Sequence, residues 1–473
     1  MKHAYANHYA EGRFLPSRGT ARMPVVDPST GVEAGHVASC STEDVERAIG
    51  SARSGFQAWS RSTLDERREA LGRLHAQLSA RADEATRLLA QEIGCPVWLG
   101  GLMQLPMPLK GLELAIEAIG QIDWEERVGN GVVERVPSGV LAAITPWNFP
   151  LHQIVAKVAA AIAAGCTVVL KPSEVAPGAA MVFAEAAHAA GLPAGVFNLV
   201  WGGPDVGEQL VRHPGVDRIS FTGSTHVGRR IMAAAAEGPK PVTLELGGKS
   251  AAVLLEDADL DAALPAVLRM SMANSGQACV CQSRLIAPRR LVPEIRRRLQ
   301  DGLDHWPVGS PLDPATRLGP VATKAQFERV QAMIRRAVAQ GGDLVFGGAS
   351  PDSEARAGFF VQPTLVDGVT PAMELAQEEV FGPVLALMPY DDERQAIEMA
   401  NATRYGLSGA VWSGDADRAR AAARQMKTGQ VVINGAPQNL ATPFGGWGWS
   451  GFGRENGRFG IEDLLNYRAL HGA

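Results

Sequence analysis

Residues 139–170 decide the fold, and they read GVLAAITPWNFPLHQIVAKVAAAIAAGCTVVL. The apolar run at 139–144 predicts a buried strand. Residues 153–164 place apolar side chains along one helical stripe, and Gly165 is a typical C-terminal stop for a helix. A second strand is expected at 166–170. A strand, a helix and a second strand in this order predict a parallel pair with the helix packed on one face.

The same alternation of strands and helices extends along the chain. Further strands are expected at 196–200, 218–221 and 251–255, and further helices at 179–190, 205–212 and 259–273. The first third is expected to be mainly helical, with long helices at 42–59 and 65–93. Repeated strand–helix–strand units imply parallel sheets that are covered on both faces, and such sheets bind ligands at the carboxyl ends of their strands.

A hairpin interrupts this alternation at 121–136, where apolar and charged residues alternate around Gly129-Asn130-Gly131. An exposed hairpin presents an unpaired edge, which proteins usually cover or pair. We therefore assign the hairpin to contact between subunits. We expect an α/β fold with two parallel-sheet domains and a small β flap for oligomerisation, assembled as a homodimer or homotetramer.

Composition and charge exclude several classes of function. The 473 residues are 46% apolar and 20% charged with a net charge of -5, so no basic surface for nucleic acid is expected. No apolar run is long enough to span a bilayer, and the start has no signal-peptide core. Five cysteines are few and odd in number, which favours a reducing cytoplasm over a disulfide framework. No His and Cys residues show metal-ligand spacing, so we expect no metal site.

Three separate segments supply the residue types of covalent acyl chemistry. Cys279 follows a small Gly-containing loop, which suits an exposed nucleophilic thiol. Its site should lower its pKa, because the thiolate is the nucleophile. Glu245 lies in an apolar, Gly-rich stretch, which suits a base whose pKa is raised by burial. Asn148 offers a side-chain amide donor on a turn flanked by prolines, which suits an oxyanion site.

Each of these residues also has a simpler interpretation. Cys279 could be a packing residue, because cysteine is among the most buried residue types. Glu245 could pair with Lys249, although that spacing requires a helix and the two intervening glycines disfavour one. Asn148 could stabilise its own turn. The combination of all three residues favours the catalytic interpretation.

Eight motifs occur in the order typical of one enzyme family. They are EIGCP at 92–96, PWNFP at 146–150, KPSE at 171–174, FTGSTHVG at 221–228, LELGGK at 244–249, GQAC at 276–279, EEVFGPV at 378–384, and PFGG at 443–446 followed by SGFGRE at 450–455. On these motifs the chain resembles the aldehyde dehydrogenase superfamily over nearly its whole length. The resemblance implies oxidation of an aldehyde to a carboxylic acid with reduction of NAD(P), by the hydrolytic route that does not acylate coenzyme A.

The resemblance also implies catalytic roles and domains. Cys279 forms a thiohemiacetal and then a thioester, which is hydrolysed by water that Glu245 activates. Lys157 and Glu455 match positions proposed to relay the proton from Glu245, and a simple salt bridge between them is the alternative. The implied division is 1–118 and 138–247 for the dinucleotide-binding domain, 248–449 for the catalytic domain, and 119–137 and 450–473 for the oligomerisation hairpin and tail.

The dinucleotide site lacks a G-x-G-x-x-G motif, and residues 223–228 instead close a strand and open a helix. Backbone N–H groups at that helix start, assisted by Ser224, can receive a pyrophosphate. In the resemblance, Lys171 and Glu174 bind the adenine-side ribose, and the carboxylate disfavours a 2′-phosphate, so NAD is expected and NADP is the alternative. The full set of expected cofactor-binding residues is Ile144, Thr145, Trp147, Lys171, Ser173, Glu174, Phe221, Gly223, Ser224, Gly228, Leu246, Gly247, Glu379 and Phe381.

The last two residues of this set are implied to contact the nicotinamide ribose and ring. A helix-terminal acid for Glu379 and a core aromatic for Phe381 are the simpler interpretations. Cys281 is expected to line the substrate pocket, or alternatively to cap Cys279 reversibly upon oxidation. Gly448 departs from the lysine that many relatives carry at that position.

The expected substrate is a small-molecule aldehyde in a tunnel lined by Phe149, His152, Gln153, Cys281, Gln438 and Phe444, with Ala156, Leu102 and Met103 nearby. A semialdehyde with a carboxylate would need an arginine clamp, and residues 151–157 contain none. We therefore expect an uncharged aliphatic or aromatic aldehyde, and a semialdehyde only if Arg284 or another arginine reaches the tunnel. His152 and Gln153 could bond the substrate or satisfy the local backbone.

Two other functions stay open at this point. A CoA-acylating dehydrogenase needs no hydrolytic base, so Glu245 counts against it. A catalytically silent dinucleotide-binding protein on the same fold is disfavoured by the joint presence of Cys279, Glu245 and Asn148.

Overall fold

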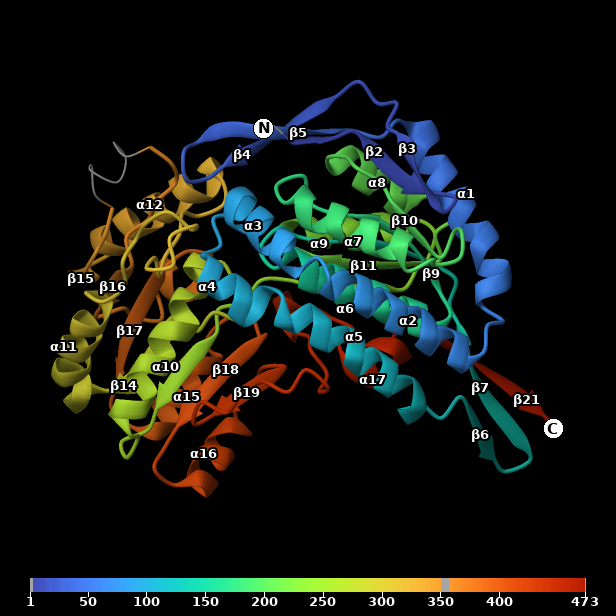
Figure 1. Ribbon diagram of the computed structural model, residues 1–473. Coiled ribbons are helices and arrows are strands. Elements are labelled where there is room, and N and C mark those ends of the chain that lie inside the picture. The colour runs from blue at the N-terminus through green and yellow to red at the C-terminus, as the bar shows by residue number, and fades with distance from the viewer. Residues whose placement is uncertain (1–2, 350–356, 473) are drawn as a thin grey trace.

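The computed structural model of the chain describes residues 3–349 and 357–472. Two large sheets, each flanked by helices, form two lobes side by side, and a thin β arm projects from one of them (Figure 1). The expected α/β fold with parallel sheets is confirmed. Among the described residues, the helices include none that is long and apolar enough to cross a membrane.

The first large sheet has eight strands in the order β20-β12-β11-β8-β9-β10-β2-β3. Its strands are β2 (Asn7–Ala10), β3 (Arg13–Pro16), β8 (Val140–Ile144), β9 (Thr167–Lys171), β10 (Phe197–Leu199), β11 (Arg218–Thr222), β12 (Val242–Glu245) and β20 (Gly451–Phe452). Strands β12 to β10 pair in parallel, and β20, β2 and β3 pair antiparallel at the edges. Every residue of β8 and β9 is buried, as expected for central strands that are covered on both faces.

The helices expected at 42–59, 153–164, 179–190 and 205–212 are found to within three residues at each end, whereas the single helix expected at 65–93 is two helices, broken at residues 80–81. The helices around this sheet are α1 (Thr42–Trp59), α2 (Leu64–Ser79), α3 (Ala82–Ile93), α4 (Val97–Leu99), α5 (Pro106–Ala118), α6 (Pro150–Ala164), α7 (Pro177–Ala189), α8 (Pro204–Arg212) and α9 (Thr225–Ala235). Pro150, Pro177 and Pro204 each occupy the first turn of their helix, where a missing N–H costs no hydrogen bond. Gly165 ends α6 in the left-handed conformation, with a φ of 84°.

The beginning of the chain differs from the prediction of a mainly helical first third. Residues 3–38 form β2 and β3 at the edge of the eight-stranded sheet, and β1 (His3–Tyr5), β4 (Arg22–Asp27) and β5 (Val32–Ala38) in a separate sheet. The β4–β5 turn contacts the other lobe, where the Phe359 N–H donates to the Pro28 carbonyl at 2.8 Å. The prediction is wrong for these residues: β2–β3 and β4–β5 are local hairpins, and β2 joins the large sheet by pairing with the distant β10.

The second large sheet has seven strands in the order β15-β16-β17-β14-β13-β18-β19, and all but β15 pair in parallel. Its strands are β13 (Ala251–Leu254), β14 (Arg284–Pro288), β15 (Asp343–Phe346), β16 (Thr364–Asp367), β17 (Val384–Tyr390), β18 (Ser408–Trp412) and β19 (Gln430–Ile433). The helices beside it include α10 (Leu260–Met272), α11 (Val292–Leu303), α12 (Lys324–Ala339), α14 (Glu374–Gln377), α15 (Glu393–Asn401) and α16 (Ala416–Ala423). Alternate residues of β13 enter two separate apolar clusters, so a core lies on each face of the sheet.

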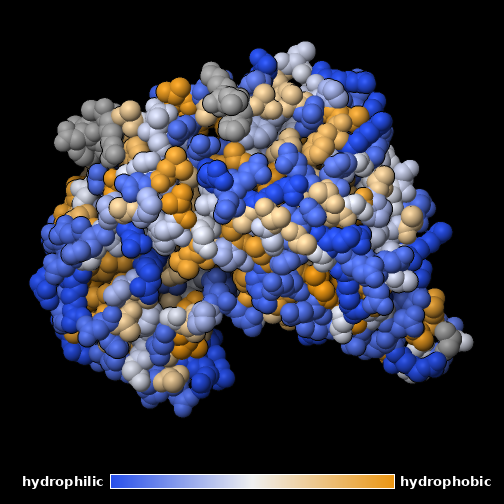
Figure 2. All heavy atoms as spheres, in the orientation of Figure 1, coloured by the Kyte–Doolittle hydropathy of each residue, from blue (hydrophilic) through white to orange (hydrophobic). Residues whose placement is uncertain are grey.

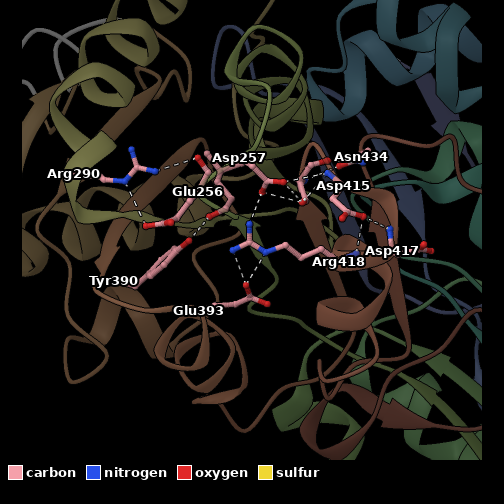
Figure 3. Close-up of polar contacts among 11 residues, drawn as sticks. Glu256, Asp257, Arg290, Tyr390, Glu393, Asp415, Asp417, Arg418 and Asn434 are labelled. Atoms are coloured by element: carbon pink, nitrogen blue, oxygen red, sulfur yellow. Dashed lines mark hydrogen bonds and ion pairs between the residues drawn. The ribbon is translucent and has the colours of Figure 1, made fainter.

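Polar contacts close the carboxyl edge of the seven-stranded sheet (Figure 3). Arg418, in the first turn of α16, donates to Glu393 at 2.9 Å and to Asp257 at 3.0 Å. The Tyr390 hydroxyl, at the end of β17, donates to the Leu254 carbonyl at 2.9 Å. Because protein groups bond one another along this edge, the edge at which parallel sheets usually bind ligands is already occupied here.

The projecting arm contains the predicted hairpin and the end of the chain. β6 (Glu125–Val128) and β7 (Gly131–Pro137) pair antiparallel across the Gly129-Asn130 turn, and β21 (Leu465–His471) pairs with the other side of β7. The preceding C-terminal elements lie elsewhere. β20 pairs with β12, and α17 (Gly457–Glu462) packs on α5 and α6.

Arg284, the first residue of β14, is buried and bonds only to backbone carbonyls among the described residues. Its Nε donates to the Lys249 carbonyl at 2.9 Å, Nη1 to Met399 at 2.9 Å and Nη2 to Ala400 at 2.8 Å. The guanidinium therefore joins the start of β14 to the chain before β13 and to the end of α15. All three nitrogens are used inside this lobe, so Arg284 is not available as a clamp for a substrate carboxylate.

We expect Arg284→Lys to lower the free energy of unfolding by about 2–4 kcal/mol, because one ammonium cannot reach three diverging carbonyls and each buried polar group left unpaired costs about 1–3 kcal/mol. The measurement is urea-induced unfolding of the purified variant. Arg297→Lys is the control, since Arg297 is 65% exposed and pairs with Asp301 on the surface of α11. Equal midpoints for the two variants would contradict the assigned role.

Candidate active site

The carboxyl edge of the eight-stranded sheet faces the amino edge of the seven-stranded sheet. Strands β8, β9, β11 and β12 end at the carboxyl edge of the eight-stranded sheet, and β12 ends with Glu245. Residues 246–250 then lead directly into β13, so the amino edge of the seven-stranded sheet lies next to it. The loop that contains Cys279 enters β14 at this same amino edge. The expected ligand position at carboxyl strand ends therefore holds for the first sheet only.

Hydrogen bonds join the PWNFP turn to the cysteine loop. The Asn148 amide Nδ2 donates to the Gln277 carbonyl at 3.0 Å, two residues before Cys279. In return, Asn274 Nδ2 and Gln104 Nε2 each donate to the Asn148 carbonyl at 2.9 Å. Because Nδ2 carries two hydrogens, one of them is left for an acceptor in the site. The structure thus brings the predicted oxyanion donor and the predicted nucleophile together.

The backbone of Cys279 packs tightly against the linker between the sheets. A Cβ atom on Gly248 would lie 2.6 Å from the Cys279 carbonyl oxygen, so only glycine fits there without a shift. Burial, followed by the negative charges of Glu379 and Glu245, raises the pKa of the Cys279 thiol above its ordinary value. The sequence analysis expected a lowered pKa. The structure instead gives a thiol that is protonated at neutral pH and needs a base.

Glu245 is a buried carboxylate without a partner. It ends β12 with 2% of its surface exposed, and neither carboxylate oxygen has a hydrogen-bond partner within the described chain. Burial, followed by the charge of Glu455, raises its pKa well above the ordinary value. The alternative ion pair with Lys249 does not form, since the Lys249 ammonium also has no partner in the described ranges.

The loop of the PFGG motif covers the Glu245 carboxylate. A Cβ atom on Gly445 would lie 2.8 Å from Glu245 Oε1, and Gly445 has a φ of 153°. The neighbouring Phe444 pairs through its backbone with Glu455, by bonds of 2.9 Å and 2.8 Å. This loop therefore excludes water from one side of the carboxylate and places Glu455 near it.

Lys157 and Glu455 form a buried ion pair beside Glu245. The Lys157 ammonium also donates to Ser220 at 3.0 Å and to Thr222 at 2.8 Å. Thr222 in turn donates to the side-chain oxygen of Gln153 at 3.1 Å. Gln153, expected in the substrate tunnel, is thus engaged in this network. The ion pair is compatible with both the proton-relay and the salt-bridge interpretation.

An apolar wall lies next to the cysteine loop. Phe149, Ala278 and Cys281 form one buried cluster, against which Met103 and Val280 pack. The Cys281 sulfur lies 3.0 Å from the carbonyls of Met270 and Ser271, and burial raises the pKa of its thiol to about 12. A neutral thiol turned toward backbone carbonyls suits a wall residue and does not suit a reactive one.

The remaining tunnel candidates are spread over a wider region. Burial lowers the pKa of His152 to about 4, and His152 borders a small cavity between α5 and α6 that Ala156 also lines. Leu102 is 64% exposed, and Gln438 is exposed on the loop after β19. His152 is therefore a neutral imidazole inside the molecule, whereas Leu102 and Gln438 lie at the surface.

The candidate cofactor residues follow the carboxyl ends of the first sheet. Thr145, directly after Ile144 of β8, has a buried hydroxyl with no partner among residues that the structure describes. Lys171 ends β9 with its ammonium 3.8 Å from Glu174. The hydroxyl of Ser173 accepts from the Val175 N–H at 3.3 Å, so it is partly used in its own turn.

Close packing shapes the start of α9. The Ser224 hydroxyl accepts from the Val227 N–H at 3.3 Å and caps this helix. A Cβ atom on Gly223 would lie 2.5 Å from the Phe221 ring, and one on Gly228 would lie 2.6 Å from Leu246. These glycines leave room for the backbone N–H groups of the helix start to approach a phosphate.

Glu379 and Phe381 reach the junction from the other lobe. The Gly248 N–H donates to Glu379 Oε1 at 3.0 Å, and Glu379 also packs against Gly247. Burial raises the pKa of Glu379 to about 7. The Phe381 ring meets the Trp147 ring edge to face at 5.5 Å, and its backbone has a left-handed φ of 57°. A non-glycine residue held in this conformation is typical of functional sites.

Several residues at the site were not identified from the sequence. Gln104 lies on a π-helical turn (Gly100–Gln104) far from the other motifs, and no local pattern indicates its bond to Asn148. Thr222 and Gly445 lie inside recognised motifs, which could have suggested them. Arg454, whose charge acts on Glu245, is the arginine of the SGFGRE segment.

Glu245→Gln should stabilise the fold relative to the wild type as the pH rises. Because the folded-state pKa of Glu245 is raised, its contribution is fully present below the ordinary pKa of 4.5 and is lost as the pH rises through the folded value. Thermal unfolding of both proteins at acidic and alkaline pH measures this difference. A gap between the two that shrinks with increasing pH would contradict the unpaired, buried carboxylate.

Known proteins match the chain along its whole length. The model of the aldehyde dehydrogenase family matches residues 14–470. The chain is 43% identical over 470 residues to a 3-succinoylsemialdehyde-pyridine dehydrogenase of Pseudomonas sp, covering 99% of this chain and 98% of that protein. The resemblance based on the eight motifs and the match to the family model thus indicate the same group of enzymes.

Solved structures agree with this match. Aldehyde dehydrogenase C of Pseudomonas syringae, a mutant in complex with NAD+ and octanal, has a TM-score of 0.97 and 41% identity, over 99% of this chain and 97% of that chain. An aldehyde dehydrogenase of Mycobacterium tuberculosis in complex with NAD+ has a TM-score of 0.96 and 38% identity, over 100% of this chain and 99% of that chain. The chain therefore belongs to the aldehyde dehydrogenase family.

Proposed function

We propose that this chain oxidises an uncharged aldehyde to a carboxylic acid with NAD+, through a thioester on Cys279 that Glu245 hydrolyses. Membership of the family gives the reaction class. The observation that carries the assignment of residues is the buried, unpartnered carboxylate of Glu245 next to the thiol of Cys279. Burying an unpaired carboxylate lowers the stability of a folded protein, and a role as a general base would explain why it is present.

Cys279 and Glu245 form an acid–base pair in the first half of the reaction. The thiol is protonated, so Glu245 takes its proton while the sulfur bonds to the aldehyde carbon. The carbonyl oxygen receives the electron pair and becomes an oxyanion. The second N–H of Asn148 Nδ2 and the backbone N–H of Cys279 would hold it. Losing one such donor typically costs about 3–4 kcal/mol of barrier stabilisation.

The second half of the reaction needs Glu245 as a base again. Glu245 passes the first proton to the Lys157–Glu455 pair, which lies beside it and leads away from the sulfur. It then takes a proton from the water that attacks the thioester, and the acid leaves as Cys279 regains its thiol. A raised carboxylate pKa suits this cycle, because the group must both accept and release protons near neutral pH.

The residues at the first sheet fit a bound dinucleotide. The unpartnered Thr145 hydroxyl supplies a donor, the start of α9 supplies backbone N–H groups, and the Lys171–Glu174 pair lies where a ribose would be held. Glu379 and Phe381 would contact the nicotinamide end. When bound, NAD+ would accept the hydride from the substrate carbon. The carboxylate of Glu174 favours NAD over NADP.

Three observations support an uncharged aliphatic or aromatic substrate. The wall of Phe149, Ala278 and Cys281 is apolar. Arg284, the arginine named above as a possible clamp for a semialdehyde carboxylate, bonds three backbone carbonyls instead. One structural relative was solved with octanal, and a sequence relative is named for a pyridine-containing semialdehyde.

Two variants separate the halves of the reaction. With octanal and NAD+ but no coenzyme A, Cys279→Ala should form no NADH. Glu245→Gln should keep the sulfur but lose the base that serves both the thiol and the water, so NADH should form more slowly than in the wild type and stop at one per site, with an octanoyl adduct left on Cys279. Stopped-flow absorbance and intact-mass analysis measure these outcomes.

Cys166→Ala is the matched control, because this buried thiol contacts the Ser138 hydroxyl and donates to the Leu464 carbonyl, away from the site. It should retain steady turnover. Wild-type rates in Glu245→Gln, or NADH formation that depends on coenzyme A, would contradict the proposal. Dinucleotide binding without any turnover in the wild type would favour the silent binding protein instead.

We also infer that the arm joins subunits. Its three strands expose Val128 (57%), Tyr467 (66%) and Leu470 (39%), and apolar atoms gather on this projection in Figure 2. Apolar side chains on an exposed three-stranded sheet indicate a partner surface. We propose 1–118 with 138–247 as the dinucleotide-binding domain, 248–449 as the catalytic domain, and the arm as the assembly segment of a homodimer or homotetramer. Of the expected assembly segments 119–137 and 450–473, the tail contributes only β21 to the arm, because β20 and α17 pack on the first lobe.

Replacing both Tyr467 and Leu470 by Glu should lower the molecular mass in solution toward that of one chain, because charges would be buried in the subunit contact. Size-exclusion chromatography with light scattering measures the mass. Leu312→Glu, at a residue 49% exposed outside the arm, is the control and should leave the mass unchanged. An unchanged mass in the double variant, or a monomeric wild type, would contradict the inference.

A further inference from the structure

Three potential metal ligands converge at the opposite end of the eight-stranded sheet from Glu245. His8 lies on β2, Cys40 lies just before α1, and Asp44 lies in the first turn of α1. One ligand atom from each of the three side chains lies within 4.8 Å of the other two, and all three residues are buried. Figure 1 shows β2 beside α1, and these two elements pack directly.

The His8 side chain is a buried polar group without hydrogen bonds to the rest of the described chain. It is 1% exposed, and neither ring nitrogen has a hydrogen-bond partner in the part of the chain that the structure describes. A buried polar group without a partner costs about 1–3 kcal/mol, so each such group in a native protein requires an explanation. A histidine that merely fills the core would be expected to bond at least one carbonyl or hydroxyl. A metal ion would satisfy one nitrogen directly.

Hydrogen bonds orient the side chains of Cys40 and Asp44. The Trp201 N–H donates to the Cys40 sulfur at 3.3 Å, and the Ser17 hydroxyl lies 3.8 Å from it. Asp44 Oδ2 accepts from the N–H groups of Arg18 at 2.7 Å and Ser41 at 3.0 Å. These bonds orient the carboxylate and leave Oδ1 to serve as a ligand.

We propose that His8, Cys40 and Asp44 bind one divalent ion of the zinc class through an imidazole nitrogen, the thiolate sulfur and a carboxylate oxygen. With bonds of about 2.0–2.3 Å in a tetrahedral arrangement, such ligand atoms lie about 3.3–3.8 Å apart, so the three side chains need to close by about 1 Å. Binding releases the Cys40 proton, and the thiolate and carboxylate then balance the two positive charges. Nitrogen and sulfur ligands favour Zn2+ or Co2+ over Ca2+ or Mg2+.

A water molecule or another ligand would complete the coordination of the ion at a fourth position, on the side of the Ser17 hydroxyl. The metal site would be structural rather than catalytic, because it is far from Glu245. β2 is five strands away from β12, or about 24 Å at the usual strand spacing. The ion would join the edge strand β2 to the start of α1. This proposal departs from the expectation of no metal site, which was based on ligand spacing in the sequence; residues 8, 40 and 44 have no recognised spacing.

Cobalt is the probe that reports sulfur ligation. Cys279→Ala protein, which removes the active-site thiol, is freed of metal with a chelator and titrated with Co2+ alone. We expect a sulfur-to-cobalt charge-transfer band in the near ultraviolet and the visible bands of a tetrahedral ion, both saturating at one equivalent. Zn2+ should remove these bands and raise the melting temperature.

Two further variants in the same background locate the ion. Cys40→Ser should lose the charge-transfer band, and His8→Gln should weaken Co2+ binding at least tenfold. Cys166→Ser, at a buried thiol outside the cluster, is the control and should keep both bands. Far-ultraviolet circular dichroism verifies folding, and His8→Gln decides the matter if Cys40→Ser does not fold. Absence of a stoichiometric band, or a band that persists in Cys40→Ser, overturns the proposal.

Discussion

The five residues between β12 and β13 impose the constraint on which the site depends. Residues 246–250 are too few to separate the two sheets, so the carboxyl edge of one must abut the amino edge of the other. The contact is tight enough to require Gly248, since a side chain there would strike the Cys279 carbonyl. Glu245 and Cys279, which are 34 positions apart in the printed sequence, therefore become neighbours without a long active-site loop.

Dehydration of this junction sets its electrostatics. Burial is the first cause of the raised pKa values of Glu245, Glu379 and Cys279. Carboxylates and a thiol that are close together and shielded from water cannot all be ionised, so protons are shared among them. Lys157, a cation whose charge lowers the pKa of Glu245, is itself paired with Glu455. In the proposed function, this balance of charges would let one carboxylate serve both as a base for the thiol and as a base for water.

The two edges of the seven-stranded sheet carry different groups of residues. Its carboxyl edge is closed by bonds such as those of Arg418 with Asp257 and Glu393 (Figure 3). Its amino edge carries Cys279, Glu379 and the Arg284 anchor. Ligand sites in parallel sheets usually lie at carboxyl edges, and the eight-stranded sheet follows this rule. In the proposed function the nucleophilic thiol comes from the other lobe, at the amino edge of its sheet.

The sequence alone determined the elements whose signals are local, and the tertiary structure decided the rest. The apolar run at 139–144, the helical stripe at 153–164 and the stop at Gly165 correspond to β8, α6 and its C-terminus, because strand alternation and helix periodicity are read within a few residues. The residue types of Cys279, Glu245 and Asn148 could likewise be read from short motifs. The five strands of residues 3–38, the anchoring of Asn148 by Gln104, and the meeting of His8 with Cys40 could not be predicted this way. The bond of Gln104 to Asn148, the meeting of His8 with Cys40 and the pairing of β2 with β10 depend on contacts between distant segments, which only the packing of the folded chain brings about. The β2–β3 and β4–β5 hairpins are local, but their side chains show too little alternation to be recognised.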